Sequence, residues 1–184
     1  MSTTTEARPE IATGTWQIDP SHSDVSFTVR HLVVSKVRGQ FSTFSGTIDI
    51  AENPLDSSVV AGIDLASVDT RDAKRDEHLR GADFFDVENH PSMDFRSTAV
   101  RPTGDGYAVD GELTIRGVSR PVTLVLEFNG VASDPWGGTR AGFSASTEIS
   151  RKDFGISFDI PVANGPAVVG DKIQINLEVE AVKQ

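Results

Sequence analysis

The strongest constraint on the fold is an alternation of apolar and polar residues that recurs along most of the chain. In the segment 24–30, Val25, Phe27 and Val29 alternate with polar residues. Successive side chains of a β-strand point to opposite faces, so this period of two indicates a strand with one buried face. About eight segments show the pattern, and their inward-facing members begin with Val25, Phe44, Val59, Met93, Tyr107, Val122, Phe143 and Ile173.

Short turn signals separate several of these segments, as at 104–106, 116–121, 135–138 and 164–166. Two-faced strands joined by such turns are typical of an antiparallel barrel or sandwich. A phase change near Thr43 predicts a β-bulge. One helix is expected over 69–81, capped by Asp69, with Asp76 and Arg80 paired and Gly81 at its end. Its thin apolar face predicts a position on the rim of the sheet structure.

The remaining organisation is simple. The polar composition of residues 1–13 predicts a flexible arm, and the length of residues 14–184 is typical of a single domain. The start of the chain shows no basic region followed by an apolar stretch, so we expect a cytoplasmic protein without stable membrane insertion. The formal charge of -10 disfavours binding to nucleic acid. The chain has no cysteine, which excludes disulfides, thiolate nucleophiles and zinc fingers.

Four histidines are the first candidates for a metal site or a catalytic base: His22, His31, His78 and His90. None stands in a spacing typical of metal ligands, so no metal and no cofactor are expected. The pair Ser21 and His22 has no nucleophile elbow around it, which disfavours a serine hydrolase. His31 continues the inward face of its strand and is the histidine expected to point toward a core or pocket.

The supply of aromatic side chains is the feature with the clearest bearing on function. The chain has ten phenylalanines, most of them on inward faces or beside the expected helix. They fill a core in one interpretation and line a ligand cavity in the other, because an eight-stranded barrel is wide enough for either. Small inward residues favour open space: Ala61, Ser97, Gly111, Ala145 and Thr147.

Four ordered motifs resemble one known family. They are the segments 18–41, 75–86 with 91–95, 111–122, and 151–156. Together they resemble the YceI family of bacterial lipocalin-like polyisoprenoid-binding proteins, over nearly the whole chain from Thr15. The resemblance implies an extended, eight-stranded antiparallel barrel, mainly β, with a short helical insertion and a long apolar tunnel. It also implies a homodimer that carries a lipid and has no catalytic residues.

On this resemblance the ligand is a long-chain amphiphile, a polyisoprenoid or an isoprenoid-quinone precursor. The predicted lipid-binding residues are Phe27, Val29, His31, Phe41, Phe44, Phe84, Phe85, Met93, Phe95, Phe143, Phe154 and Ile156. The predicted head-group residues are Arg30, Arg38, Arg151 and Lys152. Two alternatives stay open: a lipid-directed hydrolase that uses His22 or His31, and a stress or interaction protein whose barrel is filled with side chains.

Overall fold

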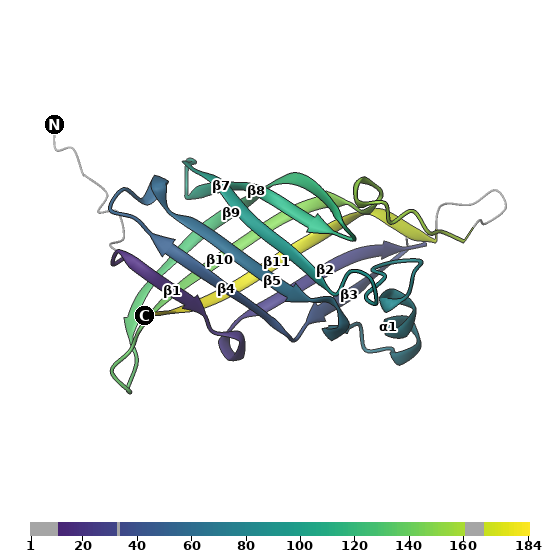
Figure 1. The fold of residues 1–184 in the computed structure, drawn as a ribbon, viewed down its shortest axis with the longest axis horizontal. Coiled ribbons are helices and arrows are strands. Elements are labelled where there is room, and N and C mark those ends of the chain that lie inside the picture. Colours follow the sequence, from purple (N-terminus) through teal and green to yellow (C-terminus); the bar gives the residue numbers. More distant parts are fainter. Residues whose placement is uncertain (1–10, 33, 161–167) are drawn as a thin grey trace.

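The computed structural model describes residues 11–32, 34–160 and 168–184 and shows one antiparallel sheet closed on itself (Figure 1). The elements in chain order are β1 (Gly14–Ile18), β2 (Asp24–His31), β3 (Ser35–Phe41), β4 (Phe44–Ile50), β5 (Ser58–Asp64), β6 (Val68–Asp69), α1 (Ala73–Arg80), β7 (Ser92–Pro102), β8 (Tyr107–Ile115), β9 (Val118–Ser133), β10 (Thr139–Ser150) and β11 (Val169–Lys183). Four short 3₁₀ turns join them: Pro20–His22, Pro54–Asp56, Leu65–Ser67 and Arg151–Phe154.

These strands form an eight-stranded barrel because the first three strands of the meander are each broken in two. β1 and β2 both pair with β11. β4 pairs with β1, and β3 pairs with β2. In the same way, β5 pairs with β4, and β6 pairs with β3. The pairing of β1 with both β4 and β11 closes the sheet. The predicted mainly β barrel is thereby confirmed. The phase change near Thr43 is a break between β3 and β4, where we expected a bulge.

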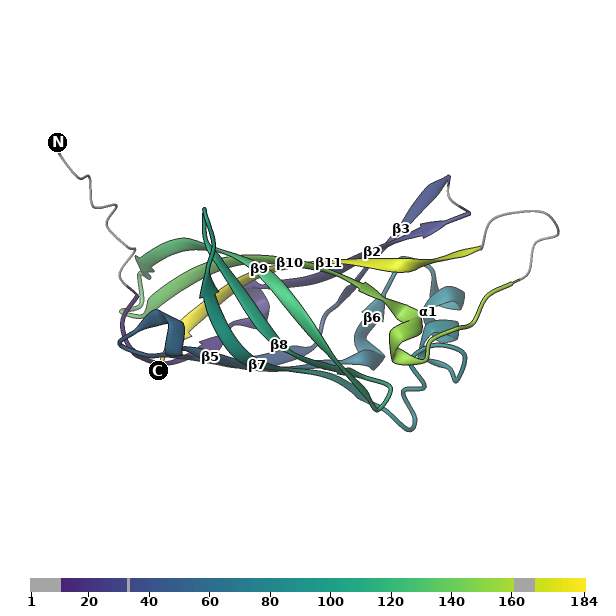
Figure 2. The same ribbon diagram turned by 90° about the horizontal axis from the view of Figure 1, so that it is seen from above.

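The barrel has two unlike ends. At one end lie the β9–β10 hairpin, the Pro54–Asp56 turn and the C-terminus, whereas α1 and the β2–β3 hairpin lie at the other (Figures 1 and 2). Toward the α1 end, β9 and β10 separate: their pairing stops at Val125 and Ser146, and the last residues of β10 pair with β11 alone. The 3₁₀ turn Arg151–Phe154 packs against β9, β10 and β11 there.

The helix is shorter than predicted and is held differently. Asp72 caps it, accepting hydrogen bonds from the backbone N–H groups of Lys74 and Arg75, whereas Asp69 lies in β6. Asp76 is buried and accepts bonds from Thr70 N (2.9 Å) and Thr70 Oγ1, so the expected pairing with Arg80 is wrong. Gly81 ends the helix as expected.

Arg80 instead donates to two main-chain carbonyl oxygens of the segment before the helix, those of Ala66 and Val68. These bonds, together with the buried Asp76, tie α1 to β6 and hold it at the end of the barrel. The expectation of a helix at the rim agrees with this position (Figure 1). None of the helices in the described ranges is long and apolar enough to cross a membrane.

Candidate functional site: an apolar cavity in the barrel

The barrel encloses a cavity of about 220 Å³ that begins at the end carrying the β9–β10 hairpin and runs to the middle of the molecule. A water molecule occupies about 30 Å³ in the liquid, so the space is much larger than a packing defect. Its lining residues are Ile11, Ile18, Val25, Phe44, Ser45, Ile48, Ile50, Pro54, Ser57, Ser58, Val59, Ala61, Ile63, Met93, Phe95, Val100, Tyr107, Val109, Leu113, Val122, Leu124, Leu126, Phe128, Phe143, Ala145, Thr147, Ile175, Leu177 and Val179.

The chemistry of this lining is uniform. Among the described residues that line it there is no Asp, Glu, Lys, Arg or His. Within the described part of the lining, the only polar side-chain groups are the hydroxyls of Ser45, Ser57, Ser58, Tyr107 and Thr147. An uncharged, aliphatic wall lowers the free energy of an apolar guest by removing it from water and offers few partners to water itself. The cavity is therefore suited to an apolar chain.

The alternation of side chains along each strand decides which residues line the cavity. In β9, Val122, Leu124, Leu126 and Phe128 all point inward, each with an exposed residue between it and the next. These four side chains are only half-buried although they face the interior. An inward side chain that keeps accessible surface is bordered by empty space, so the half-burial along β9 reflects the hollow that it faces.

Four of the twelve predicted lipid-binding residues line this cavity: Phe44, Met93, Phe95 and Phe143. The other eight lie outside the lining, toward the α1 end of the barrel: Phe27, Val29, His31, Phe41, Phe84, Phe85, Phe154 and Ile156. Several of these pack as a closed aromatic cluster. The ring of Phe41 lies 5.6 Å from that of Phe27 and 6.0 Å from that of Phe85.

A second group of rings continues the closure. Phe84, His78 and Phe158 contact one another with centroid separations of 5.0 to 5.2 Å. Phe154 is only 1% exposed. The aromatic cluster, defined here as Phe27, Phe41, Phe84, Phe85, Phe154 and Phe158, therefore blocks the cavity at the α1 end. Room for one of its rings comes from Gly39, where a Cβ would collide with the ring of Phe27.

Sequence reasoning missed most of the lining, because it gave weight to aromatic residues and little to branched aliphatic ones. The alternation that located the strands already put Ile48, Leu124, Leu126, Ile175 and Leu177 on inward faces. What the sequence did not show is where these residues lie relative to the aromatic cluster, and so whether they border the cavity. Trp16 was missed as well: it is fully buried and packs with Ala141 and Ala181, and its Nε1 donates to the carbonyl of Ala12.

Small inward residues have two separate roles. Ala61, Ala145 and Thr147 line the cavity, as expected of residues that leave space. Gly111 does not: a Cβ there would collide with the ring of Phe95, so this glycine accommodates an aromatic side chain. Ser97 binds the main chain of the neighbouring strand, because its Oγ accepts a hydrogen bond from Val59 N (2.8 Å).

The four predicted head-group residues lie outside the cavity lining. Arg30, Arg38 and Lys152 are exposed, on β2, on β3 and in the 3₁₀ turn after β10. Arg151 is buried, and its guanidinium donates to four main-chain carbonyls at 2.8 to 3.1 Å, those of Ile156, Phe158, Val169 and Gly170. These bonds join the turn to the start of β11, which gives Arg151 a structural task at the α1 end.

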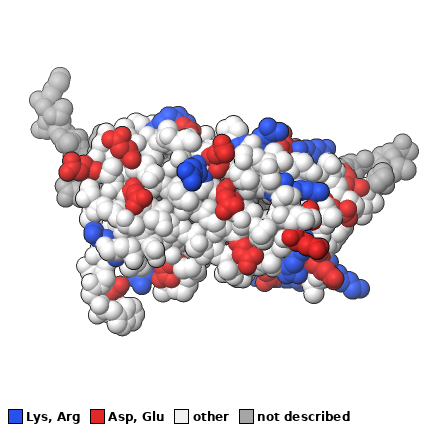
Figure 3. Space-filling view, viewed as in Figure 1, with Lys and Arg blue, Asp and Glu red and all other residues white. Residues whose placement is uncertain are grey.

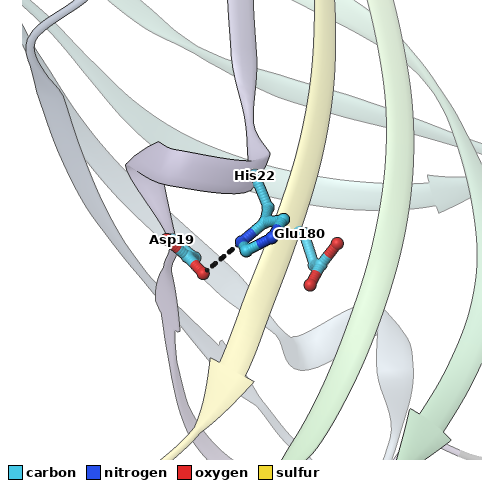
Figure 4. A group of neighbouring side chains, drawn as sticks. All are labelled: Asp19, His22 and Glu180. Carbon is cyan, nitrogen blue, oxygen red and sulfur yellow. Dashed lines mark hydrogen bonds and ion pairs between the residues drawn. The ribbon is translucent and has the colours of Figure 1, made fainter. Parts of the chain in front are cut away.

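A polar cluster on the outside of the barrel brings His22 together with Asp19 and Glu180 (Figure 4). His22 Nδ1 lies 2.9 Å from Asp19 Oδ2, and Arg140 Nη1 donates to both Asp19 Oδ2 and Glu180 Oε1 at 2.8 Å. Hydrogen bonds from Ser21, Arg140 and His22 hold the pKa of Asp19 well below its usual value. Arg140 thus already supplies the positive charge that these carboxylates require, and the cluster ties the β1–β2 junction to β10 and β11.

The same cluster tests the hydrolase alternative. A catalytic serine must contact one ring nitrogen of the histidine while the acid contacts the other. Here both Ser21 Oγ, at 3.1 Å, and Asp19 Oδ2 contact Nδ1 of His22. Ser21 Oγ also donates to Asp19 Oδ1 (2.6 Å). This arrangement does not activate the serine, and it lies outside the cavity.

A closed antiparallel barrel of eight strands with a hollow, uncharged interior is the architecture of barrels that hold one small apolar ligand. A family model described as YceI-like domain matches residues 16–181. The chain belongs to this family, as the motifs predicted.

Relatives agree with that assignment. A UPF0312 protein of Ectopseudomonas mendocina is 41% identical over 165 residues, which cover 89% of this chain and 83% of the relative. The crystal structure of BcnA from Burkholderia cenocepacia superposes with a TM-score of 0.74 at 26% identity, covering 89% of this chain and 98% of that one. A polyisoprenoid binding domain from Saccharophagus degradans shares the fold, with a TM-score of 0.70 at 14% identity over 94% of this chain and all of that one.

Proposed function

We propose that this protein binds and carries a long-chain amphiphilic lipid, a polyisoprenoid or an isoprenoid-quinone precursor, with the apolar tail inside the barrel. The observation that carries the proposal is the cavity of about 220 Å³, in which no lining residue of the described ranges carries a charged side chain. The family membership and the fold shared with a polyisoprenoid binding domain support the same choice of ligand class.

The energetics of such a ligand are favourable. Drug-sized ligands gain about 0.3 kcal/mol per heavy atom, so a fully enclosed tail of about 30 atoms gains about 9 kcal/mol, which corresponds to sub-micromolar affinity. A cavity of about 150 Å³ holds one benzene, so the cavity of about 220 Å³ encloses about nine of these atoms, and enclosing the whole tail requires the barrel to widen. Little of this needs to come from the head group. The hydroxyls of Ser58 and Tyr107 line the cavity toward the hairpin end and can bond to it, whereas Ser57 Oγ already accepts a hydrogen bond from Ala51 N.

The cationic residues Arg30, Arg38, Arg151 and Lys152 stay a prediction as head-group partners. They lie toward the α1 end, which the aromatic cluster closes, so they contact a head group only if the rings of that cluster move apart and let the head pass. A charged head group, such as a pyrophosphate, would favour this orientation, whereas a hydroxyl or quinone head favours the hairpin end.

The lining also supports a carrier over an enzyme. Nucleophilic catalysis by a hydroxyl needs an adjacent base, and among the described residues that line the cavity there is no His, Asp, Glu or Lys to activate the hydroxyls of its serines, Thr147 or Tyr107. The cavity in the hairpin half also argues against the alternative of a barrel filled with side chains. The proposal includes transport of the lipid, a cytoplasmic location and a homodimer. Cell fractionation tests the location, and light scattering of the purified protein tests the oligomeric state.

Lipid uptake tests the proposal directly. The protein is mixed with a polyprenol delivered from cyclodextrin, and complexes are counted by native mass spectrometry. We expect one polyprenol per chain, and Ala145→Phe, which puts a ring into the cavity, weakens uptake by about tenfold or more. The control is Ala99→Phe on β7, an exposed alanine outside the lining, which keeps normal uptake. Folded wild-type protein without any uptake, or equal uptake by both variants, contradicts the proposal.

A further inference from the structure

The chain has two tryptophans, and they lie in opposite environments. Trp16 is fully buried at the hairpin end of the barrel, whereas Trp136 is 85% exposed at the tip of the β9–β10 hairpin. Val131, on the same hairpin, is 42% exposed. A large aromatic side chain held in water at such a projecting tip is a feature that the carrier function does not by itself account for.

The turn that presents Trp136 is tightly organised. Asp134 Oδ1 accepts hydrogen bonds from the backbone N–H groups of Trp136 (2.9 Å) and Gly138 (2.7 Å), and Arg140 Nε donates to Asp134 Oδ2 (3.2 Å). Gly137 has a φ of +88°, which favours glycine. The tryptophan is therefore displayed on a fixed backbone, which lowers the entropy that binding would have to remove.

The tip is also electrically neutral. In the stretch 131–139 the one charged side chain is Asp134, and it is only 9% exposed and paired with Arg140. The lowest part of the hairpin, at lower left in Figure 3, is accordingly white, although the chain as a whole carries a formal charge of -10. A neutral aromatic tip on an acidic body fits an uncharged or zwitterionic surface better than an anionic one.

The hairpin leaves the barrel at the end to which the cavity extends. Phe128 and Phe143 pair across β9 and β10 below the tip, and both line the cavity, as do Ile50 and Tyr107 at the same end. A surface that contacts the tip therefore lies close to this end of the cavity.

We propose that Trp136 docks this end of the barrel onto the interface of a zwitterionic lipid bilayer. Tryptophan is the residue best suited to the level of the lipid head groups, because its ring is apolar and its N–H is polar. The inference rests on the proposed function, since docking places the cavity next to the membrane from which a lipid cargo is drawn.

Vesicle binding by the full chain tests the proposal. Phosphatidylcholine vesicles, with or without phosphatidylglycerol, are added while the emission and acrylamide quenching of tryptophan are followed, and bound protein is measured by flotation. A Trp136→Phe variant isolates the signal of Trp16. We expect Trp136 emission to shift to the blue on phosphatidylcholine, and Trp136→Ser to lower the partition coefficient by about tenfold. The matched control is Val125→Ser, which removes a 64% exposed apolar side chain from the outer face of β9 and keeps normal binding.

Three outcomes overturn docking: no shift with either vesicle, equal flotation of the Trp136→Ser and Val125→Ser variants, or a blue shift that grows with protein concentration in the absence of vesicles. The last of these identifies a second copy of the chain as the partner. Polyprenol uptake from cyclodextrin separates the two proposals, because Trp136→Ser retains it if the cavity binds lipid. A wild-type protein that docks on vesicles but takes up no polyprenol refutes the lipid carrier and leaves docking in place.

Discussion

The two halves of the barrel are made by largely the same strands and yet differ in what fills them. In the hairpin half, β10 presents Phe143, Ala145 and Thr147 to an open cavity. Toward the α1 end the same strand continues to Ile149, which is buried in the core. The inward faces are apolar in both halves. The difference comes from what is added at the α1 end, where the helix segment and the 3₁₀ turn after β10 insert Phe84, Phe85 and Phe154.

The halves also differ in what stabilises them. The α1 half is held by close packing of rings and by the buried guanidinium of Arg151. The hairpin half has a smaller buried cluster, in which Trp16 packs with Ala141 and Ala181 beside the cavity. Its strands are also joined on the outside by the cluster of Asp19, His22, Arg140 and Glu180. This comparison indicates that a binding barrel can place its larger core in one half and keep much of the other half hollow for its ligand.

The largest expected effect contrasts two phenylalanines. Phe154→Ala empties a site that is 1% exposed and should lower the free energy of unfolding by about 3 to 5 kcal/mol. Phe143→Ala removes the same atoms from a wall that already borders a cavity, so we expect about half that loss. Equilibrium denaturation in urea measures both. Equal losses would contradict the division into a filled and a hollow half.

A second contrast uses neighbouring residues of the 3₁₀ turn. Arg151→Met leaves main-chain carbonyls at the α1 end without donors and should lower the free energy of unfolding by about 2 to 4 kcal/mol. Lys152→Met, at an exposed position, should change it by less than about 0.5 kcal/mol. Thermal and urea denaturation are the measurements. Equal stability of the two variants would remove the structural task assigned to Arg151.

Acid should weaken the hairpin half. The pKa of Asp19 is lowered in the folded protein, so its stabilising contribution is full above the usual value of 3.8 and is lost as the pH falls below it. Asp19→Asn should cost about 1 to 2 kcal/mol at pH 7 and reduce the loss of stability below pH about 4.

Urea denaturation at several pH values tests this, with Glu88→Gln at an exposed carboxylate near the α1 end as control. We expect the control to follow the wild-type pH dependence. An Asp19→Asn profile that parallels wild type down to pH about 2 would rule out a stabilising role for the cluster.

The smallest expected effect is at the hairpin tip. Trp136→Ser should change the free energy of unfolding by less than about 0.5 kcal/mol, because the side chain is 85% exposed. Trp16→Phe, at the same end but fully buried and hydrogen-bonded to Ala12, should cost about 1 to 3 kcal/mol. Denaturation of the two variants side by side provides the measurement. A large loss for Trp136→Ser would show that the tip supports the fold.

The sequence allowed most strands, the turns at 104–106, 116–121 and 135–138 and the inward faces to be predicted, but not the helix cap or most of the cavity wall. The expected turn at 164–166 lies outside the described residues. Asp69 and Asp72 are both suitable caps by composition, and only the pairing of β6 with β3 assigns Asp69 to a strand. Aromatic residues were taken as lining because of their apolar area. Their size makes them efficient fillers wherever several meet, and Phe27, Phe41 and Phe85 meet at the α1 end.

By itself, then, the sequence determined the barrel and its family, because alternation and ordered motifs are local properties of the chain. Only the tertiary structure decided where the barrel is hollow. Whether an inward side chain is fully buried or lines a cavity depends on what reaches it from segments far away in sequence: Ile149 is buried in the core, whereas Ala145 and Thr147 of the same strand line the cavity. The position of Trp136 beside the end of the cavity follows from the pairing of β9 with β10, which puts the tip next to the cavity-lining Phe128 and Phe143.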